Sequence, residues 1–257
     1  MMFNRKKAVE GLRLKLNTGN VSIGSWMQLN STDVAEIMGK SSYDWIAIDL
    51  EHGSISFENL PDLFRSLELG YTLPLARIPE GTSSNCKRAL DAGAGGVIVP
   101  NIISANQLNK IRDWCAWPPA GQRGVGYSRA NLYGKYFDSY NIEAQKPLLV
   151  AQIEHNDAVN NLREILAVDG LDAIIIGPYD LSASIGLTGQ FDNKKYNQII
   201  NKIIKLSIEA SIPVGIHIVQ PDEEKLEEAI SNGFSFIAYS IDAVFLYNSV
   251  NYPSIEQ

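Results

Sequence analysis

Short apolar runs recur along the chain at intervals typical of alternating strands and helices. Each run is rich in Val, Ile, Leu or aromatic residues and is apolar nearly throughout, as expected for strands that are buried on both faces. The runs occupy residues 21–27, 44–49, 73–77, 96–100, 148–154, 172–177, 213–218 and 235–240. The pattern therefore predicts eight strands.

Helical patterns lie between most of these runs. The stretch 31–39 begins with a Ser/Thr/Asp capping cluster and ends at Gly39, and the stretch 221–233 starts with Pro and acidic residues and ends in Gly. Eight strand–helix units in about 250 residues match the number and size of a (β/α)8 barrel. We therefore predict an α/β fold, a (β/α)8 TIM barrel formed as a single domain by residues 1–257. An open doubly wound sheet is the alternative.

One long segment interrupts this alternation between the fourth and fifth predicted strands. Residues 116–146 are rich in Pro, Gly and Tyr and show little periodicity. Loops of this length in a compact domain usually have a function. We therefore expect the segment to take part in function.

Polar residues gather at the carboxyl ends of the predicted strands, where the active sites of (β/α)8 barrels lie. The opposite ends carry mostly ordinary connectors, such as Gly70, Gly95 and Pro147. The residues at the carboxyl ends are Trp26, Gln28, Asp49, Glu51, His52, Arg77, Pro100, Gln152, Glu154, Gly177, Asp180, His217, Ser240 and Asp242. This segregation predicts a catalytic mouth at one end of the barrel.

Composition narrows the class of partner. The chain has 45% hydrophobic residues and a net charge of −7, and it has no dense Lys/Arg cluster. These values disfavour binding to nucleic acid or to an anionic membrane and favour a small soluble substrate. The basic N-terminus has no apolar segment behind it, no run approaches the roughly 20 residues needed to span a bilayer, and only two cysteines occur. We therefore expect a cytoplasmic protein without structural disulfides.

Glu154 and Asp180 are the candidate metal ligands, because they follow neighbouring strands and their carboxylates could converge at the mouth. Carboxylate ligands with open positions suit Mg²⁺ or Mn²⁺, and zinc is disfavoured as the preferred metal because no Cys is near them. The alternatives are an exposed loop acid for Glu154 and a helix cap for Asp180.

Arg77 and His52 are the candidate catalytic groups. Arg77 ends an otherwise apolar strand, so its guanidinium could pair with Asp49 or Glu51, bind a carboxylate or developing oxyanion, or do both. His52 is the acid/base candidate because imidazoles titrate near neutral pH, and Asp49 or Asp91 could orient it.

The sequence gives weaker evidence for a catalytic role of the two other histidines and of the lysines. We interpret His155 as structural, whereas His217 could face the mouth or lie hydrogen-bonded in the core. All lysines fall on predicted helices or loops, which disfavours imine chemistry. The absence of a phosphate-binding glycine motif gives no support to nucleotide-dependent chemistry.

Seven short motifs are spread along the chain: 44-DWIAIDLEHG, 75-LARIPEG, 90-LDAGAGGVIVPNI, 123-RGVGYSRA, 152-QIE, 177-GPYDLSASIG and 215-GIH. The most specific pair is IDxEHG and GPxDLSxSxG, ordered correctly around QIE. With these motifs the chain resembles the HpcH/HpaI aldolase family from about Gly24 to Asp242. The family consists of metal-dependent pyruvate aldolases with a (β/α)8 barrel of the phosphoenolpyruvate/pyruvate type.

The resemblance implies roles for individual residues. Glu154 and Asp180 match the metal-ligating carboxylates, His52 matches the acid/base histidine, and Arg77 matches the arginine that steadies the enolate oxygen. Asp49 lies in the histidine's motif. Asp91 matches an acid that reaches the histidine of a neighbouring subunit. The residues expected to bind substrate are Trp26, Gln152, Gly177, Pro178, Ser182 and His217.

The implied activity is reversible cleavage of a 4-hydroxy-2-oxo acid to pyruvate and an aldehyde, through a metal-stabilised enolate. The expected cofactor is Mg²⁺ or Mn²⁺, with Co²⁺ or Zn²⁺ as alternatives, and the expected assembly is a hexamer, a trimer of dimers, often with the last helix exchanged. The alternatives are an acyl-CoA lyase of the citrate lyase beta or malyl-CoA lyase type, and a keto-acid-binding barrel without catalysis.

Two departures from the family pattern concern the aldehyde. The loop after Arg123 carries four tyrosines, and His217 replaces a small or apolar residue of many relatives. These residues suggest a polar, polyhydroxylated aldehyde. Alternatively, the tyrosines pack against a neighbouring subunit.

Overall fold

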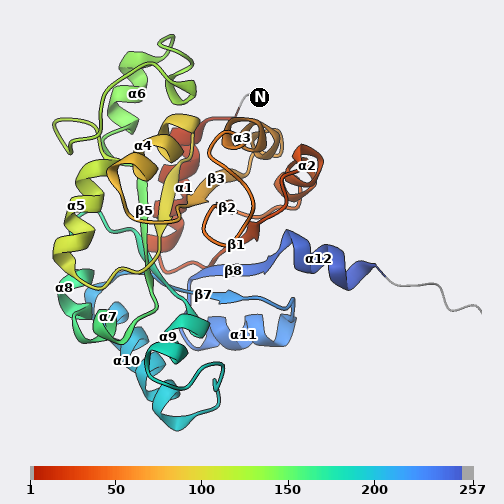
Figure 1. Ribbon diagram of the computed structural model, residues 1–257, viewed down its shortest axis with the longest axis vertical. Coiled ribbons are helices and arrows are strands. Elements are labelled where there is room, and N and C mark those ends of the chain that lie inside the picture. Colours follow the sequence, from red (N-terminus) through yellow and green to blue (C-terminus); the bar gives the residue numbers. More distant parts are fainter. Residues whose placement is uncertain (1–2, 251–257) are drawn as a thin grey trace, which may run out of the picture.

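Eight parallel strands close into a barrel in this computed structural model, which describes residues 3–250 (Figure 1). Each strand matches a predicted run to within one residue at either end, and the closed barrel excludes the open-sheet alternative. The strands are β1 Ser22–Met27, β2 Trp45–Asp49, β3 Leu73–Arg77, β4 Gly96–Val99, β5 Leu148–Ile153, β6 Ala173–Ile176, β7 Val214–Ile218 and β8 Phe236–Ile241.

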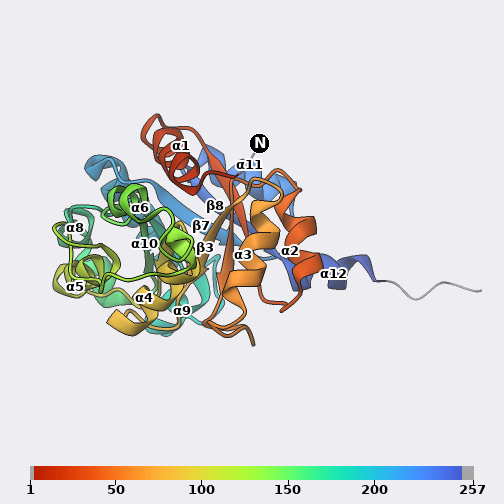
Figure 2. The ribbon, with the colours of Figure 1, turned by 90° about the horizontal axis from the view of Figure 1, so that it is seen from above.

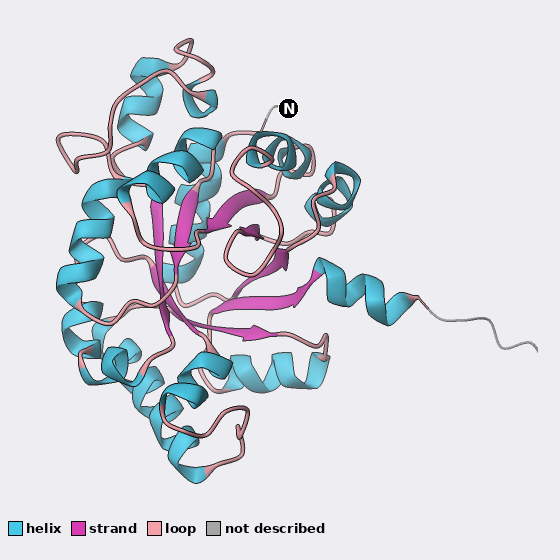
Figure 3. Cartoon of the chain, in the orientation of Figure 1, coloured by secondary structure: helices cyan, strands magenta, loops and turns pink. Residues whose placement is uncertain are grey.

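Helices surround the strands on all sides (Figures 2 and 3). The predicted helix start at Ser31 is confirmed, since the Ser31 hydroxyl accepts from the backbone N–H of Val34. No helix within residues 3–250 is long and apolar enough to cross a membrane. The helices are α1 Arg5–Asn17, α2 Thr32–Gly39, α3 Leu60–Glu68, α4 Ser83–Ala92, α5 Ala105–Cys115, η1 Arg129–Asn131, α6 Phe137–Glu143, α7 Asn156–Asn160, α8 Leu162–Leu166, α9 Pro178–Ser184, α10 Lys194–Ala210, α11 Glu223–Ser231 and α12 Asp242–Ser249.

Aromatic side chains fill the amino-terminal half of the barrel. Trp45 of β2 and Phe236 of β8 stack with ring centroids 4.4 Å apart. A Cβ on Gly24 would lie 2.1 Å from the Trp45 ring, so only glycine leaves room for the indole. Leu12 and Leu16 of α1 belong to the same buried cluster and close this end of the barrel. The opposite end of the barrel, at the carboxyl ends of the strands, is not closed by α1.

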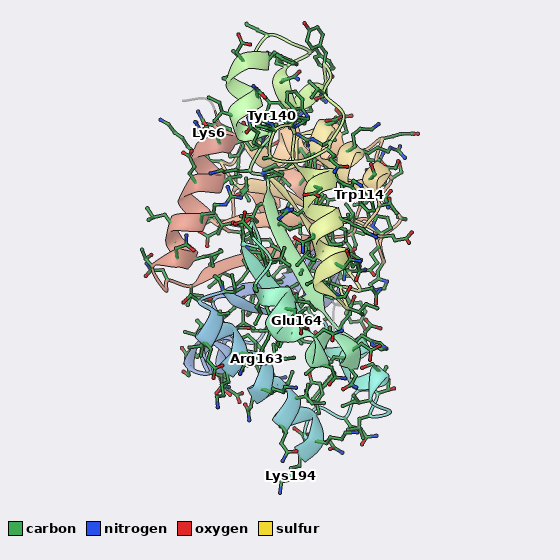
Figure 4. All side chains as sticks on the ribbon, turned by 90° about the vertical axis from the view of Figure 1, so that its left-hand side faces the viewer. Lys6, Trp114, Tyr140, Arg163, Glu164 and Lys194 are labelled. Atoms are coloured by element: carbon green, nitrogen blue, oxygen red, sulfur yellow. The ribbon has the colours of Figure 1, made fainter. Side chains whose placement is uncertain are left out.

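The long segment 116–146 lies at the closed end of the barrel. It connects the end of α5 to the start of β5, and it packs around its own small cluster of Trp117, Ala130, Tyr140 and Ala144. Its helix α6 and the helix α9 lie at opposite extremes of the molecule (Figure 1). Tyr140 and Lys194, the first residue of α10, are likewise far apart (Figure 4). Within one chain the segment therefore cannot contribute to its own mouth.

Candidate active site

A cavity of about 380 Å³ opens at the carboxyl ends of the strands. Eight of the twelve predicted site residues line it, and Asp49, Asp91, Glu154 and Ser182 do not. Its lining residues are Trp26, Gln28, His52, Arg77, Gln152, Ile175, Ile176, Gly177, Pro178, Tyr179, Asp180, His217, Val219 and Ile241. Arg77 is the only lysine or arginine among these lining residues from the described part of the chain.

A larger hollow of about 560 Å³ lies at the closed end, between α1, α3 and α6. Its two most enclosed cations already have partners, because Arg5 pairs with Glu143 and Arg129 pairs with Glu68. Paired arginines leave little free charge for a ligand. The smaller cavity at the strand ends is therefore the better candidate for catalysis.

A bidentate ion pair between Asp49 and Arg77 anchors the mouth. The Arg77 Nε and Nη2 atoms donate to the two Asp49 oxygens at 2.9 and 2.6 Å, and Asp49 is fully buried. The Gln28 amide and the backbone N–H groups of Glu51 and His52 also donate to this carboxylate, at 2.7, 3.0 and 3.3 Å. Burial opposes ionisation, but the hydrogen bonds and charge of Arg77 outweigh it and lower the pKa of Asp49. The pair fixes both the guanidinium and the chain that follows β2.

Glu51 is a further site residue that the sequence marked only as an ion-pair candidate. Its Oε2 lies 3.1 Å from Arg77 Nη1, is buried, and makes no hydrogen bond. Burial raises the pKa of Glu51 to about 7, the charge of Arg77 opposes the rise, and the charges of Asp49 and Asp180 add to it. The charge of Asp180, in the first turn of α9, therefore affects the ionisation of a carboxyl group that follows β2.

We expect Glu51→Gln to stabilise the metal-free protein in a pH-dependent manner. The pKa of Glu51 rises from 4.5 to about 7 on folding, so ionisation penalises the folded state progressively as the pH rises through this window. In urea unfolding, the free energy of unfolding of the variant should exceed that of the wild type by about 1–3 kcal/mol at pH 8 and should equal it at pH 4.5. An equal difference at both pH values would contradict the raised pKa.

Glu154 is held rigidly at the end of β5. Its Oε1 accepts from the backbone N–H of Asn101 at 2.7 Å, and its Oε2 accepts from the Gln152 side-chain amide. Asn101 has a φ of 53°, a left-handed conformation that Asn tolerates better than most residues. A Cβ on Gly177 would lie 2.5 Å from Glu154 Oε2, so glycine at that position keeps the space beside the carboxylate open. Glu154 is buried and is not an exposed loop acid.

Asp180 lies close enough to Glu154 to affect its ionisation. Burial raises the pKa of Glu154, the Asn101 amide opposes the rise, and the charges of Glu51 and Asp180 add to it. Asp180 is exposed in the first turn of α9, three residues after the N-cap Gly177, so it is not the helix cap that one alternative proposed. The charges of the two predicted metal ligands therefore interact, and their shared metal site stays a prediction.

The donor set fits a hard divalent cation. Within residues 3–250 no three His, Cys, Asp or Glu side chains form a complete metal cage. Two carboxylates with positions left for water and substrate nevertheless suit Mg²⁺ or Mn²⁺. The Gln152 Oε1, buried in the same place, has no hydrogen-bond partner and is a further unengaged oxygen.

His52 stands at the rim of the cavity. Its side chain is exposed and makes no hydrogen bond or ion pair with residues 3–250. Asp49 is occupied by Arg77 and does not orient the imidazole. Asp91 lines no part of this cavity; it lies on α4, where burial raises its pKa and the charges of Arg123 and Lys87 oppose the rise. Within one chain His52 is therefore free to meet a substrate or a second copy.

Ser182 and His155 serve local structure. The Ser182 hydroxyl donates to the Tyr179 carbonyl at 2.8 Å and accepts from the Gly189 N–H at 3.0 Å, which holds the turn after α9. Ser182 does not line the cavity, and its expected contact with substrate stays a prediction. His155 caps α7 by accepting from the Asp157 N–H, as its structural interpretation predicted.

The side of the mouth formed by β1, β7 and β8 carries neutral groups. The Trp26 ring lies 4.4 Å below the Arg77 guanidinium carbon and 5.6 Å from the His217 ring, and its Nε1 is buried without a hydrogen-bond partner. His217 Nε2 lies 3.3 Å from the Ser240 carbonyl oxygen. Burial lowers the pKa of His217 to about 4, so this imidazole is neutral at neutral pH. Both alternatives for His217 hold: it lines the cavity and is hydrogen-bonded.

This fold and this cavity define a (β/α)8 barrel whose candidate site, at the carboxyl ends of the strands, holds an ion-paired arginine and the carboxylate of Asp180. Residues 22–249 match the model of the HpcH/HpaI aldolase/citrate lyase family. The chain belongs to this family, and the resemblance predicted from the motifs is confirmed.

Relatives and solved structures agree with this membership. The hydroxypyruvate/pyruvate aldolase of Roseobacter denitrificans is 35% identical over 91% of both chains. The 4-hydroxy-2-oxovalerate aldolase of Novosphingobium aromaticivorans is 35% identical over 91% of this chain and 89% of its own. A family member from Burkholderia cenocepacia superimposes with a TM-score of 0.87 at 27% identity, covering 93% and 95% of the two chains. The protein is accordingly a carbon–carbon lyase.

Proposed function

We propose that the protein is a divalent-metal-dependent aldolase, an aldehyde-lyase that cleaves a 4-hydroxy-2-oxo acid to pyruvate and an aldehyde and also catalyses the reverse addition. The observation that carries this proposal is that Arg77 and Asp180 line one cavity, with Glu154 near enough for the charge of Asp180 to add to the rise of its pKa. Both curated relatives described above are named as aldolases, which favours this activity over a thioester lyase.

Glu154 and Asp180 would hold the cation, for which Mg²⁺ or Mn²⁺ is the proposed identity and Co²⁺ or Zn²⁺ the alternative. When bound, it supplies a Lewis acid that draws electron density from the oxo group of pyruvate. Gln152 keeps Glu154 oriented through its amide N–H, and Gly177 keeps the space beside the carboxylate clear.

Arg77 stabilises the negative charge that develops on the enolate oxygen. Of its five N–H groups, Asp49 accepts two and Glu51 faces a third, which leaves two to donate to substrate. Asp49 prevents the guanidinium from turning away, so the donors need no reorganisation when charge appears. His52, exposed at the rim, carries the proton between the 4-hydroxyl oxygen and solvent.

A second copy of the chain would complete the site by bringing Asp91 to His52, within the proposed hexamer, a trimer of dimers. Asp91 lies outside its own cavity, as an acid that acts on a neighbour must. Helix α12 projects from the barrel in two views and exposes Leu246 and Tyr247, as an exchanged helix would (Figures 1 and 2). The cytoplasmic location stays a prediction.

The alternatives fit the mouth less well. An acyl-CoA lyase needs cations for the CoA phosphates, and Arg77 is the only lysine or arginine that lines the cavity in residues 3–250. A barrel that only binds keto acids has no use for an exposed imidazole beside paired carboxylates. The thirteen lysines all lie outside the strands and the cavity lining, which leaves imine chemistry without a nucleophile.

Deuterium exchange of pyruvate tests the proposal without knowledge of the aldehyde. In deuterated buffer, chelator-stripped protein should leave the pyruvate methyl signal intact in proton NMR, and added Mg²⁺ or Mn²⁺ should cause its loss. Arg77→Ala should prevent this loss, because the enolate oxygen loses its donors. Absence of exchange with every divalent metal would reject the aldolase and direct attention to CoA esters.

A further inference from the structure

Trp26 and His217 bring one hydrogen-bond donor and one acceptor to the same wall of the cavity. We propose that this pair recognises a hydroxyl group, so that the enzyme selects hydroxylated aldehydes as the partner of pyruvate. The inference rests on the proposed aldolase activity and adds the chemical class of the second substrate. The pair lies on β1 and β7, whereas Glu154 follows β5 and Asp180 lies in the first turn of α9.

The hydrogen bond to Ser240 fixes the tautomer of His217. A backbone carbonyl can only accept, so His217 Nε2, 3.3 Å from the Ser240 oxygen, must carry the proton. In the neutral ring the other nitrogen, Nδ1, then has a lone pair and no hydrogen. Nδ1 makes no hydrogen bond with any residue in 3–250, and the ring lines the cavity. His217 therefore offers an acceptor to a ligand.

The Trp26 indole supplies the complementary donor. Trp26 is only 2% exposed, it lines the cavity, and its Nε1 has no hydrogen-bond partner. A buried N–H without an acceptor is unfavourable, so an oxygen supplied by a ligand would be favoured there. The Trp26 and His217 rings are 5.6 Å apart between centroids and tilted by 51°, which places donor and acceptor on neighbouring side chains.

A hydroxyl group matches this pair better than other polar groups do. A hydroxyl both donates and accepts, so it can pair with His217 Nδ1 and Trp26 Nε1 together. A carboxylate cannot donate to Nδ1, and an ammonium group cannot accept from the indole and would be repelled by Arg77. Val219 and Ile241 line the same wall and offer only apolar surface. An aldehyde without a hydroxyl would leave both polar groups unpaired.

Matched aldehyde pairs test the inference. With pyruvate and Mg²⁺ or Mn²⁺, the wild type should use glycolaldehyde over acetaldehyde, or glyceraldehyde over propanal, with a kcat/KM ratio of about 10. His217→Leu and Trp26→Phe should each reduce that ratio to about 1–3, because each removes one partner of the hydroxyl. His217→Asn, which keeps an acceptor oxygen near the position of Nδ1, should retain more of the preference than His217→Leu.

The outcomes separate this inference from the aldolase proposal. Loss of the pyruvate methyl signal in the wild type, without any aldehyde, establishes enolisation independently. If that exchange occurs but both wild-type ratios are near 1, the hydroxyl site is refuted and the aldolase stands. A preference that persists in both His217→Leu and Trp26→Phe also refutes it. His155→Asn, which keeps a side-chain acceptor at the N-cap of α7, serves as the histidine control and should keep the wild-type ratio.

Discussion

Glu154→Gln should abolish metal-dependent enolisation of pyruvate while the barrel stays folded. The amide is neutral and offers one acceptor oxygen where the carboxylate offers two, so affinity for a divalent cation falls. The fold should tolerate the change, because the unpartnered Gln152 Oε1 can accept from the new amide if the Gln152 side chain flips. We expect the exchange rate to drop by about 1,000-fold or more, as loss of several kcal/mol of Lewis-acid stabilisation implies.

The measurements are the rate of methyl exchange, calorimetric titration with Mg²⁺ or Mn²⁺, and urea unfolding. Glu164→Gln provides the matched control, since Glu164 is an exposed acid on α8, outside the cavity lining (Figure 4). It should behave as the wild type in all three. A Glu154→Gln protein that exchanges pyruvate at the wild-type rate would remove Glu154 from the metal site.

Arg77→Met should produce the largest loss of stability at the mouth, together with loss of exchange. It leaves the Asp49 carboxylate buried without its cation, and breaking a buried ion pair in this way costs about 3–5 kcal/mol. Folding lowers the pKa of Asp49 below its ordinary value of 3.8. The stabilisation is therefore fully present above pH 3.8 and is lost as the pH falls through the folded-state value.

The double variant Arg77→Met/Asp49→Asn separates stability from chemistry. It removes the buried charge as well as its partner, so urea unfolding should show recovery of part of the lost stability, whereas pyruvate exchange should stay absent. The double-mutant cycle measures the coupling between the two side chains. If Arg77→Met alone unfolds at the wild-type urea concentration, the ion pair does not stabilise the mouth.

Strand positions were predictable from sequence because burial on both faces leaves a continuous apolar run, and all eight runs became strands. Helix α1 went unpredicted, although Val9, Leu12 and Leu16 follow a helical spacing and are buried. The tyrosine-rich segment 116–146 was expected to be functional from its length alone. Length does not reveal at which end of a barrel a segment lies, and the structure places this one away from its own mouth.

The candidate site was predictable where function follows position along a strand. Arg77, Gln152 and His217 sit at strand ends and reach the cavity for that reason. Glu51 was underestimated, because its raised pKa comes first from burial, with smaller contributions from the charges of Asp49 and Asp180, and this burial arises only when the barrel closes. Ser182 lies on α9 and not at a strand end: its hydroxyl contacts two nearby backbone groups, and its contact with substrate stays a prediction.

The neutral side chains of the mouth come from β1, β7 and β8, whereas the carboxylates and the arginine come from β2, β3, the end of β5 and the first turn of α9. The charged side chains proposed to promote enolisation and the neutral side chains proposed to contact the aldehyde therefore come from different elements of the fold. Saturation libraries restricted to Trp26, His217, Val219 and Ile241 should change acceptor scope while sparing the catalytic carboxylates. Such a division makes the barrel a suitable starting point for engineered carbon–carbon bond formation, in which one nucleophile is kept and the electrophile is exchanged.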